Sequence, residues 1–187
     1  SKNMGSMVES RVHPAMISFD NPLSNVKGTL NAITLTADAV GKIFLYGHGA
    51  GMMPTASAVV GDLVDLARNL LTNSTARIPI LSSPMNHIRN IPLTPIEKIR
   101  THYYFRFSAL DRPGVLSKIT GILGKYEISI KSVHQKGRKT NSSVPLVMLT
   151  HLAEEADVIK AMSEISLLNV VSDEPVLIRI EDENRQE

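Results

Sequence analysis

The sequence contains no cysteine and no tryptophan, and only 4% of its 187 residues are aromatic. Without cysteine the chain has no disulfide framework and no thiol chemistry. So few aromatic side chains argue against the stacking surfaces that bind single-stranded nucleic acids. An excess of one charge is also lacking, since 20 basic and 18 acidic residues give a net charge of +2. This balance gives no electrostatic reason to expect nucleic acid or an anionic membrane as a partner.

Long apolar runs are absent too, and none approaches the roughly 20 residues that a membrane-spanning helix requires. The first residues do not show the pattern of a secretory signal, so we expect a cytoplasmic protein with no membrane partner. The six histidines are scattered without the spacing of metal ligands. We therefore expect no metal site, and we interpret His13, which precedes a proline, as structural.

The first half of the chain divides into three parts by its apolar pattern. Residues 1–10 are small and polar, and we interpret them as a tag remnant or a cut linker outside the fold. In residues 11–71, the β-rich runs Leu30–Thr36 and Lys42–Tyr46 precede a helix that follows Pro54 and has apolar residues at three- and four-residue steps. Residues 72–100 carry four prolines, which predict an extended linker because proline interrupts helices and sheets.

The second half shows a more regular pattern. Apolar residues alternate from Tyr103 to Ala109, and a turn follows at Asp111–Gly114. A helical stripe comes next, made of Leu116, Ile119, Ile122, Leu123 and Tyr126. Strands at 128–134 and 144–150, a helix opened by Glu154 and Glu155, and a last strand at 176–180 complete the series. The order strand, helix, strand, strand, helix, strand predicts a ferredoxin-like α+β domain over residues 101–183.

Two stretches of the sequence resemble known families. FSALDRPGVLSKITGILGKYEISIKSVHQKG, residues 107–137, resembles the opening of an ACT domain, a small regulatory module that binds amino acids. RVHPAMI and NPLSNVKGTLNAITLTADAVGKIFLYGHGAGMMPTASAVVGDLVD resemble the C-terminal part of homoserine dehydrogenase. The resemblance implies a C-terminal fragment, in which a partial α/β segment of the dehydrogenase core at 11–71 precedes the ACT domain. The family's G-x-G-x-x-G loop and catalytic lysine are not in this sequence, so we expect no catalytic residue and no bound cofactor in the fragment.

The glycine-rich stretch LYGHGAG, residues 45–51, joins the second predicted strand to the predicted helix. By spacing alone it is a tight turn that needs no ligand. The resemblance implies that its small residues let the backbone approach NAD(P) in the parent enzyme, with Gly49 nearest and Gly47 and Gly51 forming the turn. The family usually has arginine at the position of His48, so a permanent positive charge is missing here.

The turn at Asp111–Gly114 has two interpretations. By spacing, Asp111 caps the following helix. The resemblance to ACT domains implies that an amino-acid effector binds here, between two paired domains. The implied contacts are Asp111, Arg112, Gly114, Val115, Leu116, Ser129, Ile130 and Gln135.

The resemblance also implies a function for the parent enzyme, which would reduce aspartate semialdehyde to homoserine with NAD(P)H in threonine and methionine biosynthesis. Threonine is the effector expected from that pathway. The alternative is an ACT-based oligomerisation module without a small-molecule ligand. In either case we expect self-association through the ACT domains and through the apolar stripe Ala56–Leu71, which lacks a sheet to pack on.

Overall fold

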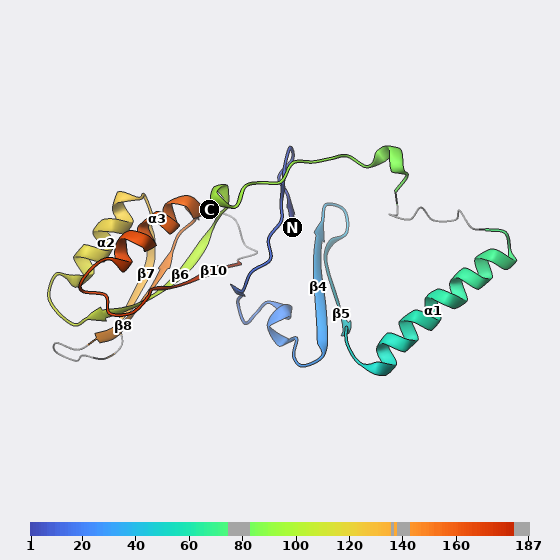
Figure 1. Ribbon diagram of the computed structural model, residues 1–187, viewed down its shortest axis with the longest axis horizontal. Helices are drawn as coiled ribbons and strands as arrows, with labels where there is room; N and C mark the ends of the chain where they lie inside the picture. The colour runs from blue at the N-terminus through green and yellow to red at the C-terminus, as the bar shows by residue number, and fades with distance from the viewer. Residues whose placement is uncertain (75–82, 136, 138–142, 182–187) are drawn as a thin grey trace. The chain divides into compact units, whose positions relative to one another are not determined.

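The computed structural model describes residues 1–74, 83–135, 137 and 143–181. The chain divides into two compact units, drawn in Figure 1. Unit 1 consists of Ser1–Ile17 together with Ile91–Glu187, and unit 2 is Ser18–Asn90. Unit 2 is therefore inserted in the sequence of unit 1.

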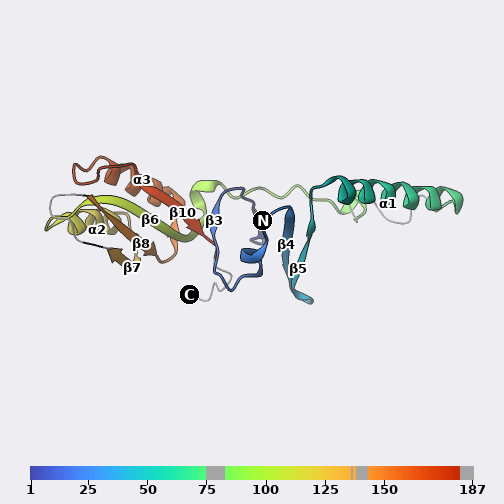
Figure 2. The same cartoon turned by 90° about the horizontal axis from the view of Figure 1, so that it is seen from below.

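Unit 1 contains an antiparallel sheet in the order β10-β6-β8-β7, with the short strand β3 added parallel to β10 at one edge (Figure 2). Its main elements are β3 (Ala15–Met16), β6 (Arg100–Leu110), α2 (Val115–Lys125), β7 (Ile130–Gln135), β8 (Ser143–Thr150), β9 (Ala153–Glu154), α3 (Glu155–Ser166) and β10 (Val176–Ile180). β9 pairs with the beginning of β6. From β6 to β10 this is the predicted ferredoxin-like topology, and the α+β fold class is confirmed.

The core of unit 1 lies between the sheet and its two helices. Tyr103, Phe105 and Phe107 alternate along β6 and have no exposed surface. Around them α2 contributes Ile119 and Leu123, and α3 contributes Val158 and Ile165. Burial of each large side chain contributes about 1.5–3 kcal/mol.

One residue of the predicted α2 stripe, Leu116, is not part of the core. Leu116 is 44% exposed, and Val115, at 4%, takes the place in the core. Val115, Ile119 and Ile122 follow one another at steps of four and three and lie on one face of α2, while Leu116 lies one residue further round the helix.

The residues predicted to flank the folded regions also take part in unit 1. Residues 1–10, expected outside the fold, form the paired strands β1 (Lys2–Asn3) and β2 (Val8–Glu9), and Glu9 is only 4% exposed. The end of the predicted linker, residues 91–100, includes the 3-10 helix η3 (Ile96–Lys98) and the buried Ile99. Composition did not indicate this because both segments are ordered by contacts with distant parts of the sequence. Residues 75–82 of the predicted linker lie outside the described residues.

Unit 2 contains the hairpin of β4 (Leu30–Ala37) and β5 (Gly41–His48), followed by α1 (Met52–Leu71), as the apolar pattern predicted. Short 3-10 helices lie at Pro22–Asn25 and Met85–His87. No residue of α1 is buried within this chain. In the described part of the chain, no helix is both long enough and apolar enough to cross a membrane.

Candidate functional site

A hollow of about 190 Å³ lies in unit 1 where β6 ends and α2 begins. Its lining residues come from β6, the following turn, α2, β7 and β8, and are Ala109, Leu110, Asp111, Arg112, Pro113, Gly114, Val115, Leu116, Gln135, Val144 and Leu146. Six of the eight implied effector contacts are among them. Gln135 Nε2 on β7 donates a hydrogen bond of 3.3 Å to Asp111 Oδ1 in the turn before α2. This bond joins two parts of the lining that are distant in the sequence.

The other two implied contacts, Ser129 and Ile130, do not line the hollow. The Ser129 carbonyl accepts a hydrogen bond from the His151 amide at 2.9 Å, and Ile130 packs against the core. Sequence reasoning missed the apolar side of the hollow, formed by Ala109, Val144 and Leu146. Their alternation in β6 and β8 was a usable signal, because it marks them as residues that face the helices.

The start of α2 differs from the capping interpretation. The N-cap is Gly114, with φ 85° and ψ −10°, and no side chain caps the helix. Asp111 lies outside the helix and bonds to Gln135 instead. The first bond into the helix runs from the Lys118 amide to the Gly114 carbonyl at 3.1 Å, so the amides of Leu116 and Ser117 precede it and point outward as donors.

Glycine at position 114 is required by its backbone conformation. A Cβ there would meet no atom within 4 Å, but its φ of 85° lies in the left-handed region that side chains disfavour. The hollow thus combines an acid, Asp111, and a base, Arg112, with an apolar wall. Such a site can accept an ammonium group and donate to a carboxylate.

The glycine-rich loop of unit 2 is shaped by its own neighbours. The Gly49 amide donates to the Thr29 carbonyl at 3.3 Å, and His48 Nδ1 lies 3.0 Å from Thr29 Oγ1. A Cβ at Gly49 would lie 1.6 Å from Asn31 Nδ2, so any larger residue requires the exposed Asn31 side chain to move.

The other two glycines of the loop have different surroundings. Gly51, with φ 123°, is the N-cap of α1. Gly47 pairs with Asn31 in the hairpin, and a Cβ added to it would meet no atom within 4 Å. These requirements are internal to unit 2. The NAD(P) contacts implied for Gly47, Gly49 and Gly51 in the parent enzyme therefore stay a prediction.

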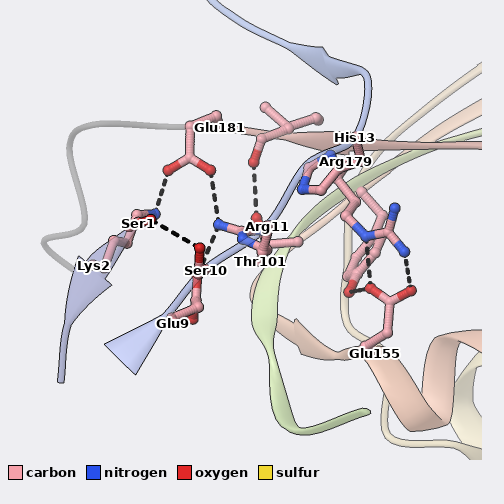
Figure 3. Close-up of polar contacts among 12 residues, drawn as sticks. Ser1, Lys2, Glu9, Ser10, Arg11, His13, Thr101, Glu155, Arg179 and Glu181 are labelled. Atoms are coloured by element: carbon pink, nitrogen blue, oxygen red, sulfur yellow. Dashed lines mark hydrogen bonds and ion pairs between the residues drawn. The ribbon is translucent and has the colours of Figure 1, made fainter. Parts of the chain in front are cut away.

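A polar cluster in unit 1 was not found from the sequence (Figure 3). Glu155, whose side chain is 4% exposed, pairs with Arg179 and accepts a hydrogen bond of 2.7 Å from the Tyr103 hydroxyl. Burial and the hydrogen bond to Glu155 raise the pKa of Tyr103 far above its ordinary value. Burial alone would raise the pKa of Glu155, but hydrogen bonds from Arg179 and Tyr103 outweigh it and hold this pKa below the ordinary value. The sequence alone indicates Glu155 only as an acid at a helix start.

A metal centre finds no support in the described residues, where no group of three or more histidine, aspartate and glutamate side chains is placed to hold an ion.

Comparisons with known proteins connect both units to one family. Residues 1–64 match the family model of homoserine dehydrogenase, and residues 103–166 match that of the ACT domain. Homoserine dehydrogenase from Pseudomonas aeruginosa is 40% identical over 177 residues, which are 94% of this chain and 41% of the relative. The enzyme from Neisseria gonorrhoeae is 36% identical over 181 residues, covering 97% of this chain and 42% of the relative.

Solved structures agree with this assignment. The crystal structure of homoserine dehydrogenase from Thiobacillus denitrificans has a TM-score of 0.82 and 41% identity, covering 95% of this chain and 40% of that one. The homoserine dehydrogenase of Staphylococcus aureus, at 21% identity and a TM-score of 0.52, supports the fold alone. The chain spans about 40% of the length of these relatives. Residues 1–64 therefore match the homoserine dehydrogenase family and residues 103–166 match the ACT domain, and together they correspond to a C-terminal part of such an enzyme.

Proposed function

We propose that this chain is the C-terminal regulatory portion of a homoserine dehydrogenase. The parent enzyme would reduce aspartate semialdehyde to homoserine with NAD(P)H, in threonine and methionine biosynthesis. The proposal is supported by the matches to both family models in one chain. The residues of hydride transfer would belong to the part of the enzyme that this chain does not span, and NAD(P) would bind there with the Gly47–Gly51 loop near its edge.

We further propose that the hollow at Asp111–Leu116 binds an amino-acid effector, with threonine as the expected ligand. Its volume of about 190 Å³ is the observation that carries this proposal. Sites for drug-sized ligands measure about 300–1,000 Å³, so this one suits a molecule of amino-acid size. The effector carboxylate would lie at the outward amides of Leu116 and Ser117, where the helix start favours negative charge. Its ammonium group would face Asp111.

Calorimetric titration of the 187-residue chain with L-threonine tests this site. Serine, methionine and isoleucine are titrated separately as controls. Saturable heat that is selective for threonine is the expected result. The variant Asp111→Ala should lose the heat, because it removes the acid that faces the ammonium group. Asp157→Ala, which removes an exposed acid on α3 away from the hollow, should bind as the unmodified chain does. Equal binding by both variants would place the ligand elsewhere.

The second candidate function is an assembly module without a ligand. It is favoured by the position of β7, which pairs with β8 on one side and, within the described residues, has no strand on the other. An open strand edge of this kind can pair with a second copy. The apolar face of α1 is a further contact surface, with Val60 57% and Leu63 60% exposed.

Two measurements distinguish the two functions: light scattering gives the mass of the chain in solution, and thermal unfolding gives its melting temperature. A stable oligomer whose mass and melting temperature do not respond to any amino acid would favour the assembly module. A melting temperature that rises selectively with threonine would favour the effector site, since a ligand that binds only the folded state stabilises it.

A further inference from the structure

The first 17 residues, which we name the N-terminal arm, complete the sheet of unit 1 although residues 18–90 separate them from the rest of that unit. β3 in the arm runs parallel to β10, with Ala15 opposite Arg179 and Met16 opposite Ile180. The Glu181 amide donates to the Met16 carbonyl at 2.9 Å. The arm therefore covers the last two residues of the β10 edge, which would otherwise be open (Figure 2).

Partly buried ion pairs hold the arm against the end of β10 (Figure 3). The Arg11 side chain is only 7% exposed, and its Nη2 lies 2.9 Å from both Glu9 Oε1 and Glu181 Oε2. Lys2 forms a second ion pair with Glu181. Two cations thus meet two carboxylates, one of which lies just beyond β10. Because Arg11 is desolvated, these contacts depend on the pairing of its charge.

The strand that the arm contacts is also tied to the ACT core. Arg179, in register with the arm, extends its side chain to Glu155 at the start of α3. Thr101 Oγ1 on β6 donates to the Ile180 carbonyl at 2.8 Å. β10 is therefore held by the arm on one edge and by β6 and α3 on the other. A displacement of β10 within the ACT domain must change the contacts of the arm.

Both covalent connections between the units leave from the arm or from residues bonded to it. One connection follows β3 directly at Ile17. The other enters unit 1 at Ile91, beside a segment that is bonded to Val8. The Val8 amide donates to the Pro92 carbonyl at 3.0 Å, and the Thr94 amide donates to the Val8 carbonyl at 2.9 Å.

We propose that the N-terminal arm is the coupling element of this chain: it fixes both connections to unit 2 onto β10, so that changes in the ACT sheet reach the dehydrogenase portion through it. Its role in regulation rests on the proposed function. The attachment itself rests on the ion pairs of Lys2, Arg11 and Glu181, on β3 and on the hydrogen bonds of Val8.

Hydrogen exchange of the 187-residue chain tests the attachment. Arg11→Gln should speed exchange in residues 8–16 and 92–94 by about 100-fold, because an unpaired buried carboxylate favours local opening. The core amides of β6 and α2 should keep the protection they have in the unmodified chain. Lys160→Gln, which removes an exposed cation on α3, is the matched control and should change neither region. Glu181→Gln removes both ion pairs between the arm and β10 while Arg11 stays paired with Glu9. It should also speed exchange in residues 8–16, which keeps the test decisive if one variant does not fold.

The effector response of the full-length enzyme tests the coupling. Couplings between two sites are typically about 5–150-fold, and Arg11→Gln should bring the threonine response of activity close to 1 while the basal rate stays unchanged. An arm that stays protected in both variants, or one that is released while the threonine response persists, would overturn the inference. A full-length enzyme that never responds to an amino acid would refute the proposed regulation, and the exchange result would still decide whether the arm is held by these ion pairs.

Discussion

Replacing Glu155 with glutamine would remove the charge from a carboxylate that accepts three side-chain hydrogen bonds. These come from the Tyr103 hydroxyl at 2.7 Å, from Arg179 Nε at 2.8 Å and from Arg179 Nη2. Glutamine keeps the shape of the side chain, but one end of its amide can only donate. It must therefore present a donor to Arg179 or to the Tyr103 hydroxyl, and Arg179 loses its counter-charge.

The size of the effect follows from burial. Removing one partner of a buried ion pair costs about 3–5 kcal/mol, since the other charge stays desolvated. The Arg179 side chain is 18% exposed, so water relieves part of this cost and the lower value applies, about 3 kcal/mol. In a domain of the size of the ACT domain, each kcal/mol lost from the free energy of unfolding lowers the melting temperature by about 4–8 °C. We expect Glu155→Gln to melt about 12–24 °C lower than the unmodified chain.

The assay is thermal unfolding followed by near-ultraviolet circular dichroism of the tyrosines. Three of the four tyrosines lie in unit 1, at positions 103, 104 and 126, so the signal reports mainly on the ACT core. Lys160→Gln breaks an exposed ion pair with Asp157 and should give no measurable shift. Equal melting temperatures for Glu155→Gln and the unmodified chain would refute the argument.

The difference in melting temperature between Glu155→Gln and the unmodified chain should also depend on pH. The pKa of Glu155 in the folded chain is lowered, since the hydrogen bonds from Arg179 and Tyr103 outweigh the effect of burial. A lowered carboxyl pKa contributes stability above the ordinary value, and that stability is lost as the pH falls through the folded-state pKa. The difference in melting temperature between Glu155→Gln and the unmodified chain should therefore be largest near neutral pH and shrink in acid below about pH 4. A difference that stays constant across the acid range would contradict this assignment.

Three glycine substitutions test local geometry. Gly49→Ala would place a methyl carbon 1.6 Å from Asn31 Nδ2, so it should weaken hydrogen-exchange protection of β4 and β5, and Asn31→Ala in the same chain should restore it. Unchanged protection in Gly49→Ala would show that Asn31 does not set the spacing of the loop. Gly114→Ala forces alanine into φ 85° and should lower the free energy of unfolding by about 1–2 kcal/mol in a urea titration. Gly121→Ala, inside α2 with nothing within 4 Å of its added Cβ, should instead stabilise by about 0.5–1 kcal/mol, and a shared sign for both would contradict the backbone argument.

The elements that could be predicted from the sequence are those that depend on local pattern. Alternation from Tyr103 to Ala109 predicted both the strand and the side that is buried, because neighbouring side chains of a strand face opposite ways. The stripe Ile119, Ile122 and Leu123 predicted α2 for the corresponding reason in a helix. Only the position of Leu116 was wrong, since Val115 and Leu116 both lie at helical steps from Ile119 and the pattern alone did not distinguish them.

Interactions between distant residues had no such local signal. Arg11 and Glu181 are 170 positions apart, and Tyr103 and Glu155 are 52 apart. In the sequence Glu155 is one of two acids at a helix start, and Arg11 is one of 20 basic residues. The candidate site was partly predictable for the opposite reason, because Asp111–Leu116 are contiguous in the chain. Its apolar wall from β8 was missed because Val144 and Leu146 lie far from Asp111–Leu116 in the sequence.

The boundary of the regulatory unit follows from these distant contacts. A chain that began at residue 101 would contain every element of the ferredoxin-like topology, yet it would lack β3, Arg11 and the buried Ile99. The β10 edge would then be open to other chains. Glu181 would lose both of its cations, Lys2 and Arg11. The elements of the ACT topology are continuous in sequence, but unit 1, which contains them, is not. The segment that completes its sheet is the N-terminal arm, and this same segment leads into unit 2.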